Sequence, residues 1–362
     1  MRVVLATSIP RGGPIEHALM LGRDLARREI AVTAVVATRP LADRFALAGV
    51  EPVLLPLERR LDVAAWQRLR ALAGGAGVVH SHDRLSGLWA RVLPRSRPAT
   101  AFVHTVHGLP EPYLPPPVGR QHPGLRALLA YRGVERMLAA RADALLVPSR
   151  ATAEVLHERL GYPRDRITVV PNGVDQSPRP GLRGELVGTL SLLEPVKGID
   201  VFLRAAAGLA AIRPGLRFAV HGDGTQAREM KALARRLGIA DRVSFPGIVA
   251  AEDALAQLGV LVVTSWFESG AYSVLEAMAA GVPVVATRVG GIPEMAPEWA
   301  VELVEPGDVN GVTAAVLRLL DDPGLAARRA RAGMAAAAEQ SAARTADATL
   351  TIYERVLSQR RT

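Results

Sequence analysis

The chain has no cysteine among its 362 residues. Disulfides, thiolate metal sites and a cysteine nucleophile are therefore excluded. Aromatic residues make up only 4% of the chain, too few for a platform on which nucleic-acid bases would stack. No stretch approaches 18 uncharged apolar residues, and the first apolar run is too short for a signal peptide. These absences predict a cytoplasmic protein without a membrane span.

Lysine is also scarce, because Lys197 and Lys231 are the only two in the chain. Residues 1–180 carry 25 arginines against 15 acidic residues, a net charge of +10. Residues 181–362 carry 19 basic and 20 acidic residues, a net charge of −1. This asymmetry indicates an acidic partner for the first half, either an acidic acceptor molecule or an anionic membrane surface. Codon bias toward arginine is the alternative, and the scattered arginines argue against a nucleic-acid partner.

The length and the alternation of short apolar runs with helical patterns predict two α/β domains. Strands are expected at 2–7, 31–37, 53–55, 78–80, 100–105, 144–147, 167–170, 185–190, 217–221, 243–245, 260–263 and 282–286. Helices are expected at 15–28, 62–73, 84–93, 124–141, 151–160, 199–211, 226–237 and 251–257. Such alternation is typical of parallel sheets, whose ligands bind at the carboxyl ends of the strands.

The stretch from Thr264 to Pro293 organises the second half. Glu268 and Glu276 lie eight residues apart, separated by small residues that include Gly270 and Ala271. We expect Glu268 in a loop and Glu276 on the helix that follows, with backbone N–H groups at the helix start able to bind an anion. The simpler interpretation is that both glutamates are solvated surface charges.

In the first half, polar residues follow predicted strands. A Gly12-Gly13 turn comes after the first strand and opens a helix, so its backbone can approach a phosphate or a sugar closely. His82 and His107 lie just past two further strands, where an exposed histidine is a candidate for function. His80 and His104 are expected within their strands, as packed core residues.

The E-x7-E spacing, followed by EAMAAGVPVVAT and GGIPE, resembles the signature of family 4 of the retaining glycosyltransferases. The resemblance covers nearly the whole chain and implies the GT-B fold, an α/β architecture of two facing Rossmann-like domains with parallel sheets and a cleft between them. PNGVD resembles the family's crossover segment, which places the domain boundary near 178–184. Residues 1–178 would form the acceptor-side domain, residues 184–344 the donor domain, and a final helix at about 345–362 would cross back onto the first domain.

The resemblance also implies roles for individual residues. Lys197 would bind the diphosphate of the donor, Glu276 its ribose, and Glu268, Gly270 and Ala271 its sugar. TVHG resembles the loop whose histidine lies beside the donor sugar, which makes His107 a catalytic candidate together with Glu268 and Lys197. Two further sets follow: the donor-binding glycines Gly13 and Gly222, and the acceptor-side candidates Glu16, His17 and His82.

One position departs from the family's pattern. Leu192 stands where the family usually has a phosphate-binding arginine, so either Lys197 and the helix that follows Gly270 carry that role, or another arginine reaches into the site. No D-x-D and no His/Asp/Glu cluster with ligand spacing is present, so no metal and no cofactor is expected beyond the donor substrate.

The sequence thus predicts a retaining, metal-independent transferase of the hexosyltransferase type that uses a nucleoside-diphosphate sugar. The expected acceptor is a carbohydrate, lipid-linked or acidic molecule in cell-envelope polysaccharide or glycolipid synthesis, handled in the cytoplasm or at the inner face of its membrane. Two alternatives remain open: a sugar-nucleotide epimerase of the same fold, and a non-catalytic protein that binds nucleotide sugars.

Overall fold

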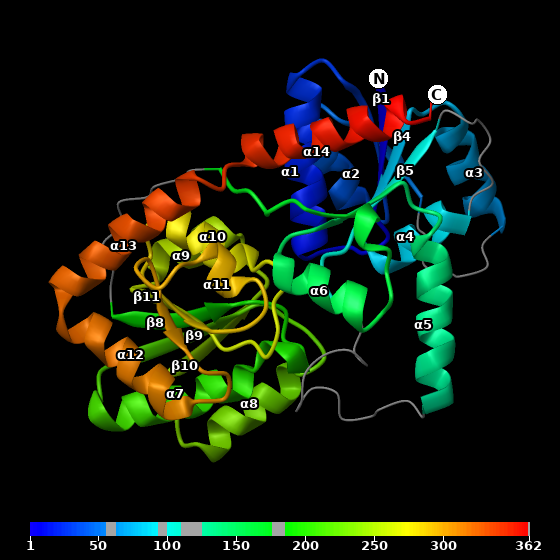
Figure 1. Cartoon of the computed structure of the whole chain (residues 1–362). Helices are drawn as coiled ribbons and strands as arrows, with labels where there is room; N and C mark the ends of the chain where they lie inside the picture. The colour runs from blue at the N-terminus through cyan, green and yellow to red at the C-terminus, as the bar shows by residue number, and fades with distance from the viewer. Residues whose placement is uncertain (56–62, 93–99, 110–124, 176–184, 361–362) are drawn as a thin grey trace. The chain divides into compact units, whose positions relative to one another are not determined.

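The computed structural model describes residues 1–55, 63–92, 100–109, 125–175 and 185–360 (Figure 1). The chain divides into two compact units. Among the described residues, the first unit comprises those up to Gly173 together with Ala342 onward, and the second comprises Val174–Ser341. The expected boundary near 178–184 and most of the proline-rich stretch after His107 lie outside the described residues.

The first unit is built on a seven-stranded parallel sheet with the order β3-β2-β1-β4-β5-β6-β7. Its strands are β1 (Arg2–Ala6), β2 (Ala31–Val36), β3 (Glu51–Leu54), β4 (Val78–Ser81), β5 (Ala101–Thr105), β6 (Ala144–Val147) and β7 (Ile167–Val169). The chain moves from β1 toward one edge and then returns to place β4 on the other side of β1. The carboxyl ends of β1 and β4 therefore mark a topological switch point, where such sheets bind ligands.

Helices cover both faces of this sheet. Successive residues of a strand point to opposite faces, so each strand contributes side chains to two cores. In β1, Val3 and Leu5 face the core under one set of helices, whereas Val4 and Ala6 face the core on the other side. The first core lies under α1 (Gly13–Arg27), α2 (Arg39–Leu47) and α14 (Ala342–Ser358), and the second under α3 (Val63–Gly74) and α4 (Arg84–Val92). The remaining helices of this unit are α5 (Leu125–Ala139), α6 (Arg150–Glu158) and the short 3-10 turn η2 (Arg164–Arg166).

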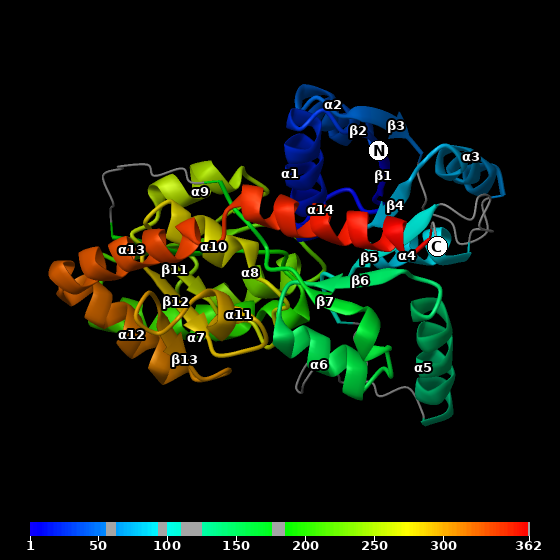
Figure 2. The same ribbon diagram turned by 45° about the horizontal axis from the view of Figure 1, so that its top comes forward.

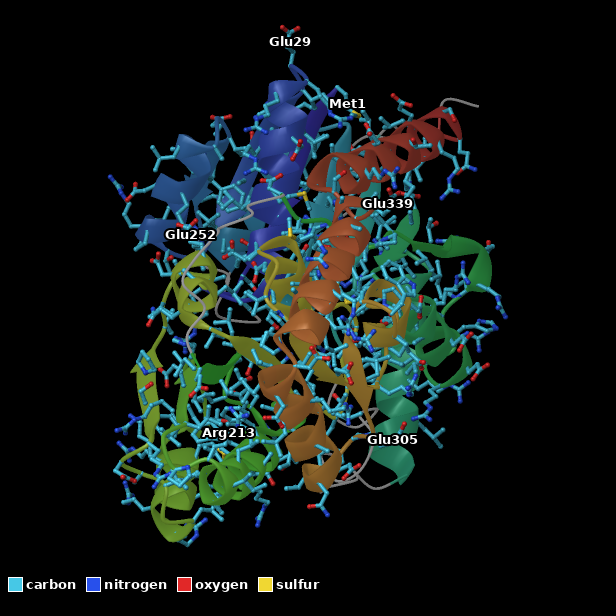
Figure 3. All side chains as sticks on the ribbon, turned by 90° about the vertical axis from the view of Figure 1, so that its left-hand side faces the viewer. Met1, Glu29, Arg213, Glu252, Glu305 and Glu339 are labelled. Atoms are coloured by element: carbon cyan, nitrogen blue, oxygen red, sulfur yellow. The ribbon has the colours of Figure 1, made fainter. Side chains whose placement is uncertain are left out.

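The last helix of the chain belongs to the first unit. Figure 2 shows α14, in red, lying along the first sheet beside α1. Tyr353 of α14 is fully buried in this core. At the far end of α1, the exposed Glu29 adopts φ 61° in the turn that leads into β2, and Figure 3 shows its side chain pointing away from the molecule.

The second unit contains a six-stranded parallel sheet with the order β10-β9-β8-β11-β12-β13. Its strands are β8 (Leu186–Leu190), β9 (Arg217–His221), β10 (Val243–Gly247), β11 (Val260–Val263), β12 (Val284–Thr287) and β13 (Glu302–Val304). Helices α7 (Ile199–Ile212), α8 (Ala227–Arg236) and α12 (Val309–Asp321) pack on one face, and α9 (Ala251–Gln257), α10 (Tyr272–Ala279) and α13 (Pro323–Ala338) on the other. The 3-10 turn η3 (Pro195–Lys197) and the four-residue α11 (Ile292–Met295) complete it.

The predicted strands are confirmed within about two residues at each end, and the parallel two-sheet architecture is confirmed as a whole. The sequence did not predict α2, α12, α13 or β13. Helix α2 contributes few buried residues and opens with Arg39-Pro40, so it carries little hydrophobic pattern. Helix α13 consists largely of alanine, glycine and arginine, and it buries only small side chains.

Candidate functional site

The second sheet has its own switch point between β8 and β11, which are neighbours although they are not consecutive in the chain. The loops that leave the carboxyl ends of these two strands therefore lie side by side. The loop after β8 contains Leu192 and ends at Lys197, directly before α7. The loop after β11 contains Ser265 and Glu268 and leads into α10.

These two loops bring Lys197 and Glu268 together, although they are 71 residues apart in the sequence. Nζ of Lys197 donates a hydrogen bond to Oε1 of Glu268 over 2.8 Å, and Oγ of Ser265 donates to the same oxygen over 2.7 Å. Glu268 is only 8% exposed. The interpretation of Glu268 as a solvated loop charge is therefore wrong. Both contacts use Oε1, and Oε2 takes part in neither of them.

Glycines allow the neighbouring backbones to approach this pair. Gly290 has φ 50°, and a Cβ there would lie 2.0 Å from the carbonyl oxygen of Glu268. The same carbonyl accepts a hydrogen bond of 2.8 Å from the N–H of Gly291. The backbone of Glu268 is thus held by the Gly290-Gly291 turn, and any larger residue at 290 would displace it.

Gly222 has a similar role beside the loop after β8. Its φ is 123°, and a Cβ there would lie 1.8 Å from the carbonyl oxygen of Ser191. Leu193 donates a backbone hydrogen bond of 3.1 Å to Asp223, so the loops after β8 and β9 are joined. Leu193 is buried, whereas Leu192 is 37% exposed. The position that departs from the family's pattern is therefore not a core position.

The remaining donor-side candidates lie on and before α10. Ala271 is the N-cap residue, Gly270 precedes it, and Glu276 lies partly exposed in the second turn of the helix. The structure places Glu268 in the loop and Glu276 on the helix, as the pattern of Thr264 to Pro293 predicts.

The switch point of the first sheet is held together by Asp83. Its carboxylate accepts a 2.6 Å hydrogen bond from the N–H of Ser8 and a short one from the Ser8 hydroxyl, which ties the end of β1 to the end of β4. The same carboxylate accepts from the N–H groups of Leu85 and Ser86 over 3.1 and 3.0 Å and so caps α4. The sequence analysis did not select Asp83, although its position just past a predicted strand could have indicated it.

Three of the predicted histidines gather at this switch point. His17 lies on α1, His82 follows β4 and His107 follows β5. Their ring centroids lie 5.3 Å apart for His17 and His82, 4.8 Å for His17 and His107, and 5.8 Å for His82 and His107. His82 is fully buried rather than exposed, which corrects the expectation for a histidine past a strand end, and His107 is partly exposed.

The other two histidines of this sheet are structural. His80 lies in β4, where one ring nitrogen is 2.5 Å from the hydroxyl of Tyr353 and the other 2.7 Å from that of Thr105. His104 lies in β5, with its Nδ1 2.9 Å from Oγ of Ser81. Both are buried in their strands, as predicted.

Burial keeps this group of histidines neutral. It lowers the pKa of His17 from 6.5 to about 4, although a side-chain hydrogen bond with Asn172 acts in the opposite direction. Burial, and next to it the charge of neighbouring histidines, lowers the pKa of His82 and His107 well below the usual value. At neutral pH these imidazoles are therefore uncharged.

Glu16 and Gly13 are the two remaining predicted residues of the first unit. The carboxylate of Glu16, on α1, accepts two hydrogen bonds of 3.1 and 2.7 Å from the guanidinium of Arg44 on α2, and both side chains are partly exposed. Gly13 is the first residue of α1, after Gly12 with φ 108°.

No helix in the described ranges is long and apolar enough to cross a membrane.

Comparison with known proteins gives a consistent result. Residues 11–177 match the family model described as Glycosyltransferase Family 4, and residues 184–322 match that described as Glycosyl transferases group 1. The D-inositol 3-phosphate glycosyltransferase of Acidothermus cellulolyticus is 32% identical over 345 residues, covering 85% of this chain and 74% of that protein. The 2-deoxystreptamine glucosyltransferase of Streptomyces kanamyceticus is 31% identical, covering 67% of this chain and 66% of that protein.

Solved structures agree on the fold. Anabaena HepE in complex with UDP-glucose superimposes with a TM-score of 0.81 at 19% identity, covering 99% of both chains. Sucrose-phosphate synthase from Thermosynechococcus elongatus gives a TM-score of 0.80 at 20% identity, with the same coverage. At this identity the likeness establishes the architecture alone, and that architecture is GT-B.

Proposed function

Because the chain belongs to family 4 of the retaining glycosyltransferases, we propose that it transfers a hexosyl group from a UDP-sugar to a hydroxyl of an acidic polyol or carbohydrate acceptor. The observation that carries this proposal is the Lys197–Glu268 pair at the switch point of the second sheet. It offers a cation for a diphosphate and a carboxylate for sugar hydroxyls at the edge where parallel sheets bind ligands.

The second unit would act as the donor domain. Lys197 would stabilise the charge that develops on the leaving diphosphate, in a role that requires no metal ion. Glu268 would accept hydrogen bonds from the sugar through Oε2, because Oε1 already accepts from Lys197 and Ser265. Glu276, Gly270 and Ala271 on and before α10 would bind the remaining groups of the donor, with Gly222 shaping the neighbouring loop. An oxygen of the leaving diphosphate would take the proton of the acceptor hydroxyl.

The first unit would act as the acceptor-side domain. Its net positive charge suits an acidic acceptor, and the relative from Acidothermus cellulolyticus acts, by its name, on D-inositol 3-phosphate. His107, which is partly exposed, would contact the substrate, with His17, His82 and Gly13 behind it. Glu16 is the weakest of these candidates, because Arg44 occupies its carboxylate.

A transfer assay tests the proposal. The protein would be incubated with UDP-glucose and other UDP-hexoses, with and without D-inositol 3-phosphate and unphosphorylated polyols, and the products followed by proton NMR. We expect a glycosylated acceptor that keeps the anomeric configuration of the donor, formed only when the acceptor is present. Conversion of the nucleotide sugar to an epimer without an acceptor would identify an epimerase, and binding without turnover for any acceptor would identify a sensor.

Helix α5 supports a location at an anionic membrane surface. Leu129, Val134 and Met137 are each at least half exposed on this helix, and they fall within an arc of about 140°. Arg132 and Arg136 are exposed beside them, while the opposite side of the helix buries Glu135, Leu138 and Ala139. Apolar side chains flanked by arginines are the pattern of a helix that lies in a lipid interface.

We therefore predict salt-sensitive binding to vesicles that contain phosphatidylglycerol, and little binding to vesicles of phosphatidylcholine. Each arginine near an anionic surface contributes about 1 kcal/mol, so changing Arg132 and Arg136 to glutamine should lower the partition coefficient roughly tenfold or more. Arg235 and Arg236, exposed on α8 of the second unit, provide the matched control, and their change to glutamine should leave binding intact. Equal sedimentation with both kinds of vesicle would contradict a membrane role for α5.

A further inference from the structure

The three histidines at the switch point of the first sheet have the arrangement of a metal site. His17, His82 and His107 come from α1 and from the loops after β4 and β5, and one ring nitrogen of each lies within 4.8 Å of those of the other two. Tetrahedral zinc bound at about 2.0–2.1 Å would hold three such nitrogens about 3.3 Å apart and the ring centres about 5 Å apart. The observed centroid distances of 4.8 to 5.8 Å already match the second requirement. The first requires the ring nitrogens, which lie within 4.8 Å of one another, to approach to about 3.3 Å when an ion binds.

The hydrogen bonding of these rings also indicates a metal site. Both ring nitrogens of His82, which is fully buried, lack a hydrogen-bond partner among the described residues, and so does the buried Nε2 of His107. A buried polar atom without a partner costs on the order of 1–3 kcal/mol. The neighbouring His80 differs, since both of its ring nitrogens have hydroxyl partners. His221 of the second unit also has unpartnered ring nitrogens, but among the described histidines of the first unit those of His82 and His107 belong to the cluster whose ligand atoms converge.

The surroundings also orient these rings. Asn172 forms a side-chain hydrogen bond with His17, and the ring of His80 packs against that of His82 with the centroids 4.1 Å apart. Both contacts restrict the orientation of rings in the cluster. His107 is the partly exposed member of the cluster, whereas His17 and His82 are buried. Three neutral imidazoles select zinc-like ions over magnesium and calcium, which prefer oxygen ligands.

We propose that His17, His82 and His107 form a three-histidine site for Zn²⁺ within the first unit, with a fourth position open to water or another small ligand. The sequence predicted no metal site, because its three members are spread over 91 positions from His17 to His107. A second consequence rests on the function proposed above: a bound zinc ion would occupy His107 and inhibit sugar transfer.

Metal binding can be measured without any substrate. Protein treated with EDTA and then freed of it would be titrated with Zn²⁺ in competition with a chromophoric chelator, and with Co²⁺ as a visible probe. We expect one ion per chain and the visible absorption of tetrahedral Co²⁺, with no binding of Mg²⁺. His82→Ala should weaken Zn²⁺ binding by roughly 100-fold or more, since even the loss of an outer hydrogen bond to a metal ligand costs 10- to 100-fold.

His107→Gln is the second variant, because this partly exposed position tolerates substitution better than the buried His82. His157→Gln is the matched control, since His157 is a half-buried histidine of the same unit whose Nδ1 contacts the carbonyl of Tyr162 over 2.9 Å. Wild-type affinity in the control and loss in both variants would establish the site. Equal Zn²⁺ affinity in the wild type and in His107→Gln would overturn it, whatever the transfer assay shows.

Discussion

Changing Lys197 to methionine is expected to weaken the binding of UDP by about 1–3 kcal/mol, which is roughly a 5- to 150-fold rise in Kd. The change keeps the length of the side chain and removes the only lysine at the switch point of the second sheet. It also leaves the Glu268 carboxylate, which is 8% exposed, without its cation. Because the side chain at 192 is an uncharged leucine, no residue at that position compensates for the loss.

The measurement is isothermal titration calorimetry with UDP, and the matched control is Lys231→Met. Lys231 is the other lysine of the chain and lies exposed on α8 of the same unit, over the ring of Phe245. The control should bind UDP as the wild type does. A Lys197→Met protein that melts like the wild type and binds UDP with unchanged Kd would show that the diphosphate lies elsewhere.

The variant Glu268→Gln, alone and combined with Lys197→Met, tests whether Lys197 and Glu268 act together in donor binding. Glutamine keeps an acceptor for Ser265 but removes the negative charge beside Lys197. If the two residues act as one unit, the loss in UDP-hexose binding in the double variant should be smaller than the sum of the two single losses. Strict additivity would mean that they bind separate parts of the donor.

Acidification from pH 7.5 to 5.0 is expected to destabilise the first unit by about 4 kcal/mol from His17 and His104 alone. Burial, followed by the charge of Arg91, lowers the pKa of His104 from 6.5 to about 3, and burial lowers that of His17 to about 4. Below pH 6.5 the unfolded chain binds protons that the folded chain does not. The contribution of these two histidines to the free energy of unfolding is therefore fully present only above that pH. It is lost as the pH falls toward the folded values. Each histidine contributes roughly 1.4 kcal/mol per pH unit, hence about 2 kcal/mol by pH 5.0.

Hydrogen exchange followed by mass spectrometry measures this effect for each unit separately. Peptides that span β4 and β5 should lose protection at pH 5.0, after correction for intrinsic exchange and with EDTA present to exclude metals. Peptides of β12 are the internal control, because the second unit contains a single histidine, His221. His104→Gln should reduce the pH dependence by its share of about 2 kcal/mol. Equal protection of β4 and β5 at both pH values would mean that these histidines are protonated in the folded state.

Much of the fold follows from local sequence. Short apolar runs such as VVLA and LVV are typical of strands buried on both faces, and their alternation with helices indicates parallel sheets. The E-x7-E stretch, whose small residues precede a helix-forming run, placed Glu268 in a loop and Glu276 on α10. Lys197 could be singled out because it lies before a helix in a chain with two lysines.

Contacts between distant segments were decided only by the tertiary structure. Ser265 and Lys197 converge on one oxygen of Glu268 because β8 and β11 are neighbours at the switch point, and strand order is not encoded in any local pattern. For the same reason the sequence did not predict the cluster of His17, His82 and His107, since their spacing matches no metal-ligand motif. The sequence by itself determined which residues end their strands at the binding edge, because period and composition are local. Which of those residues meet depends on the order in which the strands pair, and packing of the whole chain sets that order.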